Sequence, residues 1–193
     1  MQKIVFVFLS FLFFGAACED KPVAPGEDAY QHSPSSPLPA GFAGGAWFWG
    51  NSGPLSYYDH DGNHVGSATE AGRQYKFTET NGQGRLEFEQ YLGLRNASNC
   101  VTEIYTRKRG TVAFEGGNKF TFFPLEGSFK TVKSGTPASC SKETTERKAS
   151  GEDLAPVVYR YQLLPVDGQT LLYVYGETDV NFTNPLFVYQ QAE

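Results

Sequence analysis

Short glycine-containing turns between alternating apolar and polar segments restrict the fold of this sequence more than any other feature. Residues 74–80 and 85–92 alternate with period two and flank Asn81-Gly82-Gln83-Gly84, a run typical of tight turns with positive φ. Residues 111–114 and 119–123 flank a second turn of this kind, and residues 157–164 and 170–175 flank a third. Each pair predicts a β-hairpin, because alternation gives a strand one apolar face.

The other segments extend this pattern to nearly the whole domain. Residues 101–107, 126–133 and 182–189 predict further strands, and Ser150 followed by Asp153 predicts one capped helical turn. Strands in sequential hairpins form a meander, and a long meander removes its exposed edges by closing on itself. We therefore expect an all-β fold, an antiparallel up-and-down barrel of about 8–10 strands with little helix.

The first residues of the chain predict export. Lys3 precedes an uncharged stretch over residues 4–17 that is too short to span a membrane, so residues 1–17 are expected to be a signal peptide. Gly15-Ala16-Ala17-Cys18 resembles the lipobox of bacterial lipoproteins, which implies that Cys18 is lipidated. An ordinary secretory signal cut nearby is the alternative.

The residues after Cys18 refine the expected location. Glu19-Asp20-Lys21 resembles the surface-export signal of Bacteroidetes lipoproteins, which implies a lipid anchor in the outer membrane and a domain that faces the cell surface. A periplasm-facing or secreted protein is the alternative. The segment 18–40 contains five prolines, which predicts a disordered tether of roughly 65 Å at ~3.1 Å per residue, followed by the barrel domain over residues 41–193.

The cysteine count agrees with export. Of three cysteines, Cys18 is expected to carry the lipid, which leaves Cys100 and Cys140. An even pair in an exported domain predicts a disulfide, with two free thiols as the alternative. In the chain-entropy model, a disulfide at this spacing stabilises the fold by about 4 kcal/mol.

One family resemblance covers roughly residues 41–190. Gly45-Ala46-Trp47 is similar to the Gly-x-Trp signature of lipocalins. Together with the runs 109–114, 120–124 and 127–129, it resembles functionally uncharacterised lipocalin-like lipoproteins of Bacteroidetes. The resemblance implies a lipocalin or calycin type of barrel, with Trp47 packed across its closed end.

Aromatic side chains are the candidates for closing the barrel or lining a ligand cavity. These candidates are Trp47, Trp49, Tyr75, Phe77 and Phe88. Trp47 and Trp49 share one face of a strand and Phe48 lies on the opposite face, so at least one of the three side chains is expected away from the core. The wider aromatic set, which also includes Tyr91 and Tyr105, belongs to the core, lines a cavity or forms a sugar-stacking surface.

Residues 59–70 are the only segment with spacing suggestive of a metal site. Asp59, Asp61, Asn63 and Glu70 match ligand positions of an EF-hand calcium loop, but His64 stands where that loop needs glycine. A hairpin tip is the preferred interpretation, so no metal and no cofactor are predicted. A zinc site at His60 and His64 is a weaker alternative.

The sequence is compatible with a binding protein, an enzyme or a structural protein. No nucleophile elbow, phosphate loop or zinc-protease motif occurs, and the net charge of −5 argues against nucleic acid. Glu87 and Glu89 would be a solvated pair if they point outward and a lumen pair if they point inward. We expect a non-enzymatic outer-membrane or surface lipoprotein that binds a small hydrophobic ligand or an envelope protein partner. An accessory carbohydrate- or ester-active enzyme, or a purely structural barrel without ligand, is the alternative.

Overall fold

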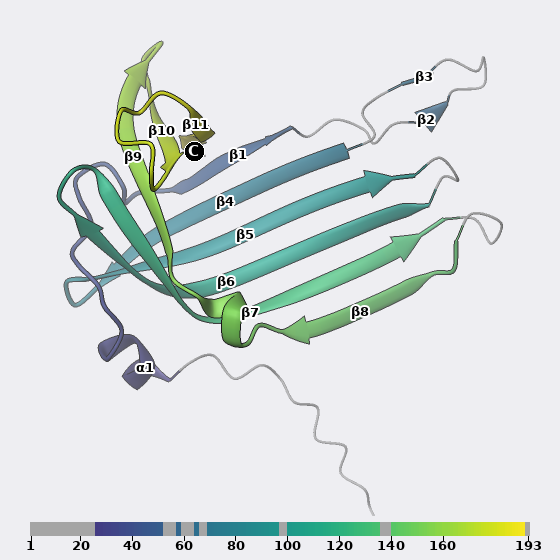
Figure 1. Cartoon of the computed structure of the whole chain (residues 1–193), viewed down its shortest axis with the longest axis horizontal. Coiled ribbons are helices and arrows are strands. Elements are labelled where there is room, and N and C mark those ends of the chain that lie inside the picture. The colour runs from purple at the N-terminus through teal and green to yellow at the C-terminus, as the bar shows by residue number, and fades with distance from the viewer. Residues whose placement is uncertain are drawn as a thin grey trace, which may run out of the picture.

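The computed structural model describes residues 26–51, 57–58, 64–65, 69–96, 100–135 and 140–191, most of which lie in antiparallel strands (Figure 1). The elements are α1 (Glu27–Gln31), β1 (Ala46–Asn51), β2 (Tyr57–Tyr58), β3 (His64–Val65), β4 (Thr69–Thr80), β5 (Gln83–Arg95), β6 (Val101–Glu115), β7 (Lys119–Ser134), β8 (Glu143–Lys148), the 3-10 turn η1 (Gly151–Leu154), β9 (Val157–Val166), β10 (Gln169–Gly176) and β11 (Pro185–Gln191). Within these ranges, none of the helices has the length and apolar character needed to cross a membrane.

A ring of 8 strands forms the barrel, in the order β1, β4, β5, β6, β7, β9, β10 and β11, with β11 paired back to β1. All of these pairings are antiparallel, and each strand lies beside the next ring strand along the chain. The short β2–β3 hairpin and strand β8 are additions to this meander. The ring confirms the prediction of an all-β, up-and-down barrel with little helix.

The barrel is closed at only one end of its longest strands. The first residues of β7, Lys119 to Phe122, pair with β9, whereas its later residues, Ser128 to Lys133, pair with β8. Beyond the ring, β4, β5, β6, β7 and β8 therefore continue side by side as an extended sheet (Figure 1). One face of this sheet continues the inside of the barrel, and the other face continues its outside.

The predicted hairpin turns are confirmed. Positive φ angles occur in all three turns, at Asn81-Gly82, Gly117-Asn118 and Asp167-Gly168. The left-handed conformation is accessible to glycine and is more accessible to Asn and Asp than to most residues, so these turn sequences fix where the chain reverses. The capped turn predicted at Ser150 is also present, since Ser150 and Asp153 form a reciprocal capping box.

Two strand boundaries differ from the expectation. The segments expected at 119–123 and 126–133 form one strand, β7, with a register shift opposite Arg109 and Gly110. The final strand begins at Pro185 rather than at residue 182, because the Asp179 carboxylate accepts hydrogen bonds from the backbone N–H groups of residues 183 and 184 and holds the chain in a turn.

Aromatic rings fill the closed end of the barrel. The buried cluster comprises Phe42, Trp47, Tyr75, Phe77, Leu86, Phe88, Val112, Phe120, Phe122, Leu172, Val174 and Tyr189. Phe42 lies at its centre, fully buried, with ring centroids 4.7 Å from Phe114, 5.0 Å from Phe77 and 5.0 Å from Tyr161. The Trp47 indole donates a hydrogen bond to the Phe42 carbonyl at 3.2 Å, which holds the Phe42 backbone against β1.

The prediction of a disordered tether is wrong for its described part, because residues 26–40 pack on the barrel. The Ser36 backbone N–H donates to the Val112 carbonyl at 3.1 Å, and the Gly84 N–H donates to the Ser36 carbonyl at 2.8 Å. The buried Thr111 hydroxyl donates to the Pro34 carbonyl at 2.6 Å. Prolines lack an N–H, so a proline-rich segment has few donors to satisfy and can lie against strands without forming one.

The predicted disulfide is confirmed. Cys100 and Cys140 are bonded, with Cα atoms 5.6 Å apart. Cys100 directly precedes β6 and Cys140 precedes β8, so the bond joins two chain reversals at the open end of the extended sheet. It thereby holds the end of the sheet that the ring does not close.

Candidate functional site

The five aromatic residues predicted to close the barrel or line a cavity lie in its core. Trp47, Tyr75, Phe77 and Phe88 are buried, and Trp49 packs against them from the side. Their rings contact one another or neighbouring core rings, as in the pair of Tyr75 and Phe88 at 5.6 Å and the pair of Trp49 and Phe187 at 5.0 Å. The structure thus places all five in or against the packed core, while a barrel-closing role and a ligand cavity among them remain predictions.

The strand register determines which polar residues point away from this core. Tyr75 lies opposite Phe88, and both are buried, so neighbours of the other parity point outward. One outward row crosses the sheet through Phe48, Gln74, Glu89 and Arg107. The next outward row passes through Gly72, Tyr91, Tyr105 and Lys130. Of the three large side chains at residues 47–49, Phe48 is the one that lies away from the core, and 43% of it is exposed.

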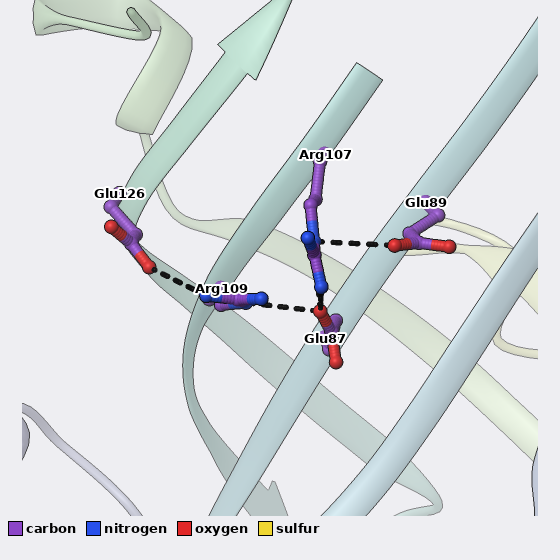
Figure 2. Close-up of polar contacts among 5 residues, drawn as sticks. All are labelled: Glu87, Glu89, Arg107, Arg109 and Glu126. Atoms are coloured by element: carbon purple, nitrogen blue, oxygen red, sulfur yellow. Dashed lines mark hydrogen bonds and ion pairs between the residues drawn. The ribbon is translucent and has the colours of Figure 1, made fainter. Parts of the chain in front are cut away.

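Glu87 and Glu89 both point outward, into a network with two arginines from β6 (Figure 2). Arg107 forms an ion pair with Glu87, and its Nε lies 3.2 Å from Glu89 Oε1. Arg109 Nε donates to Glu87 Oε1 at 3.0 Å, and its Nη1 lies 3.4 Å from Glu126 Oε1. One carboxylate oxygen of Glu87 thus receives both arginines.

This network keeps Glu87 ionised. Partial burial raises the pKa of the Glu87 carboxyl, but hydrogen bonds and positive charge from Arg107 and Arg109 outweigh that effect and lower the pKa below its usual value. A general acid that works near neutral pH needs a raised pKa. Glu87 is therefore suited to orienting the arginines rather than to donating a proton.

Two tyrosines form the aromatic part of the same face. Tyr91 and Tyr105 lie opposite each other on β5 and β6, with ring centroids 5.3 Å apart. The Tyr91 hydroxyl donates to Glu70 at 3.2 Å, and the Tyr105 hydroxyl donates to Glu103 at 3.1 Å. Burial and these carboxylates raise the pKa of Tyr91 to about 12, so its hydroxyl stays a donor at neutral pH. The hydrogen bonds fix the orientation of both rings.

Two open hollows adjoin these tyrosines. The first, of about 220 Å³, is lined by residues that include Phe48, Gly72, Glu89 and Tyr91. The second, of about 440 Å³, also includes Glu89 and Tyr91 and extends past Tyr105 to β8. We call the six side chains that define this continuous surface the outer platform: Phe48, Glu70, Glu89, Tyr91, Tyr105 and Arg107.

The charged side chains that point into the two hollows carry both signs. The acidic residues are Glu70, Glu89 and Glu146, and the basic residues are Arg107 and Lys130. Arg73 also lies along the first hollow, but its guanidinium is inside the barrel over the rings of Phe88 and Phe187. Hydrogen-bond donors and acceptors are therefore both available on this face. A surface of this kind fits a ligand that is polar but carries no large net charge.

Most of the predicted metal and lipid positions are not covered by the structure. Asp59, Asp61 and Asn63 fall outside the described residues, as do His60 and Cys18. Glu70 is described, and it accepts the hydrogen bond from Tyr91. Across the described ranges, no group of three or more His, Cys, Asp or Glu side chains is placed to hold a metal ion.

Neither a protein-family model, nor a curated protein, nor a solved structure matches this chain. The candidate site therefore rests on its own geometry.

Sequence reasoning missed the partners of Glu87 and Glu89. The run Arg107-Lys108-Arg109 carries one signal in the sequence, because residues 107 and 109 share one face of a strand by parity. The sequence does not show the register between β5 and β6, which sets Arg107 opposite Glu89 and Arg109 opposite Glu87. Lys130 was missed for the same reason, since its neighbour Tyr105 is on a different strand.

Proposed function

We propose that this protein is an exported lipoprotein that binds its ligand on the outer platform and uses the barrel as a packed scaffold. The observation that carries the proposal is the pair of hollows that share Glu89 and Tyr91 on the outside of the sheet. The inward-facing rings contact one another around Phe42 instead. Exposed aromatic rings beside fixed polar groups are typical of binding surfaces.

The lipoprotein part of the proposal rests on the sequence. A signal peptide over residues 1–17 and a lipidated Cys18 would anchor the protein in the outer membrane, and the acidic residues that follow favour the cell-surface side. The disulfide supports an oxidising compartment, because such bonds persist outside the cytosol. A periplasm-facing anchor and a secreted protein remain the alternatives.

The packed N-terminal segment changes how far the domain can stand from an anchor at Cys18. The described fold already begins at Gly26, and α1 follows directly. Eight steps of extended chain between Cys18 and Gly26 reach at most about 28 Å, compared with the roughly 65 Å of a free tether. We therefore propose that the barrel is held close to the membrane surface.

The carboxylates of the outer platform support binding without catalysis. Glu87 has a lowered pKa and is held by two arginines, which opposes the role of proton donor. Glu89 is paired with Arg107 on the exposed face. Both residues are suited to holding Arg107 in one orientation toward a ligand.

The anchor is tested by metabolic labelling with radioactive palmitate. Wild-type protein is expected to incorporate label and to fractionate with outer membranes, whereas a Cys18→Ala variant is expected to do neither. Label in the Cys18→Ala variant would contradict lipidation at this residue. Protease added to intact cells then distinguishes the surface from the periplasmic side.

The binding face is tested with full-length lipoprotein in nonionic detergent, applied to a solubilised envelope fraction. Binding is expected to fall at least tenfold in Tyr105→Ala and to remain in Leu164→Ala, a matched control whose side chain is similarly exposed on β9. Equal binding by Tyr105→Ala and wild type would refute the outer platform. A stoichiometric apolar molecule in an organic extract of the purified protein would place the ligand inside the barrel instead.

A further inference from the structure

The shape of the outer platform follows from its order across the strands. Phe48 is on β1, Tyr91 is on β5 and Tyr105 is on β6, with β4 lying between β1 and β5. Three strand spacings of ~4.8 Å give a surface about 14 Å long from Phe48 to Tyr105. This length suits a short chain of rings that crosses the strands rather than a single small molecule.

Glycines keep the space between the rings open. Gly50 and Gly72 lie opposite each other on β1 and β4, and Gly72 lies opposite Tyr91. A Cβ atom on Gly50 would come within 2.9 Å of the Phe48 ring, so the ring lies low over this glycine pair. The result is a shallow hollow with one aromatic ring on each side, instead of a ridge of side chains.

We propose that the outer platform binds a neutral saccharide chain that runs across β1, β4, β5 and β6, an inference that rests on the proposed function above. Sugar rings would stack on Phe48, Tyr91 and Tyr105. Sugar hydroxyls would be bound by Glu89 and Arg107.

The mixture of polar groups matches the chemistry of hydroxyls. A hydroxyl both donates and accepts hydrogen bonds, and neighbouring hydroxyls on a sugar can bridge a carboxylate and a guanidinium. Glu89 and Arg107 lie side by side at 3.2 Å on the exposed face, which offers both functions within one hydroxyl spacing. The aromatic rings offer apolar faces to the C–H side of the sugar.

Charge argues against the main competing ligands. Side chains of both signs line the hollows, so an anionic ligand would meet Glu70 and Glu89 and a cationic ligand would meet Arg107 and Lys130. A purely apolar ligand would desolvate these charged groups without replacing their hydrogen bonds. A neutral ligand rich in hydroxyls avoids both penalties.

The platform is also ordered in advance. Tyr91 and Tyr105 are held by Glu70 and Glu103, and Arg107 is held between Glu87 and Glu89. Side chains that are already fixed lose little conformational entropy when a ligand binds. Weak contacts with individual sugars can then add up along the chain.

Affinity electrophoresis of the full-length lipoprotein in nonionic detergent tests the proposal. The native gels would contain one soluble neutral polysaccharide each, namely β-glucan, xylan, mannan or dextran, with alginate as an anionic comparison. At least one neutral polysaccharide is expected to retard wild-type protein, with retention independent of salt. The dissociation constant derived from the retardation is expected to rise at least tenfold in Tyr105→Ala. In Tyr105→Phe, which keeps the ring, it is expected to stay within about threefold of the wild-type value. The Leu164→Ala control is expected to behave as wild type.

The outcomes separate this inference from the function on which it rests. Retention by none of the neutral polysaccharides, or only by alginate in a salt-dependent manner, would overturn the saccharide. If Tyr105→Ala still lost binding to the envelope fraction in that case, the outer platform would remain the binding face, and its ligand would not be a neutral saccharide. Envelope binding that is destroyed by protease and survives periodate would identify a protein partner and would also overturn the saccharide.

Discussion

Replacing Phe42 with alanine is expected to destabilise the barrel by about 3–5 kcal/mol, the usual cost of removing a buried phenylalanine ring. Phe42 is fully buried, although it belongs to the segment between the proline-rich stretch and β1. Its ring contacts Phe77, Phe114 and Tyr161 at centroid distances of 4.7–5.0 Å, so its removal leaves a cavity among rigid aromatic neighbours. The hydrogen bond from Trp47 reaches the Phe42 carbonyl and would survive the substitution.

Urea unfolding of the full-length protein, followed by far-UV circular dichroism, measures this effect. For a domain of this size, each kcal/mol corresponds to ~2–4 °C in Tm, so thermal unfolding of Phe42→Ala should shift by roughly 6–20 °C. The urea m-value should stay the same, because the folded and unfolded chains expose similar surface in both proteins.

Phe48→Ala is the matched control. It removes the same ring from a side chain that is 43% exposed on the outer platform, so its stability loss should stay below about 1 kcal/mol. A loss below about 1 kcal/mol for Phe42→Ala as well would refute the conclusion that the N-terminal segment completes the core. The two variants also separate stability from binding, since only Phe48→Ala should weaken the ligand interaction.

Three further substitutions test other parts of the fold. Gly84→Ala should cost about 1–3 kcal/mol in urea unfolding, because a Cβ there would lie 2.7 Å from the Ser36 carbonyl oxygen, and wild-type stability would show that residues 33–38 do not pack on β5. Cys100→Ser should lower stability by about 4 kcal/mol and abolish the sensitivity of Tm to reductant, whereas a Tm that still depends on reductant would contradict the disulfide. Asp153 has a pKa lowered from 3.8 to about 2 by its hydrogen bonds with Arg147 and the Ser150 backbone. Because its folded pKa is depressed, its contribution to stability is present above about pH 4 and is lost as the pH falls toward 2. The Tm difference between wild type and Asp153→Asn should therefore be present at pH 6 and vanish near pH 2, and a difference that does not depend on pH would exclude this carboxylate as its source.

The sequence contained enough information for the strands but not for the site. Tight turns such as Asn81-Gly82 locate the chain reversals, because few residues adopt their backbone conformation. The same alternation that predicts β5 also assigns Glu87 and Glu89 to one face, yet it cannot say which face is buried. That choice depends on how β5 pairs with its neighbours, and those pairings place both residues outside the barrel.

By itself, the sequence determined the class of fold, the meander of hairpins, the capped turn at Ser150 and the pairing of Cys100 with Cys140, because each depends on local conformation or on a simple count. Only the tertiary structure decided that Phe42 packs at the centre of the barrel core and that Arg107 forms an ion pair with Glu89. A single apolar residue beside prolines has no periodicity to reveal it, and partners on different strands are brought together only when the register is set.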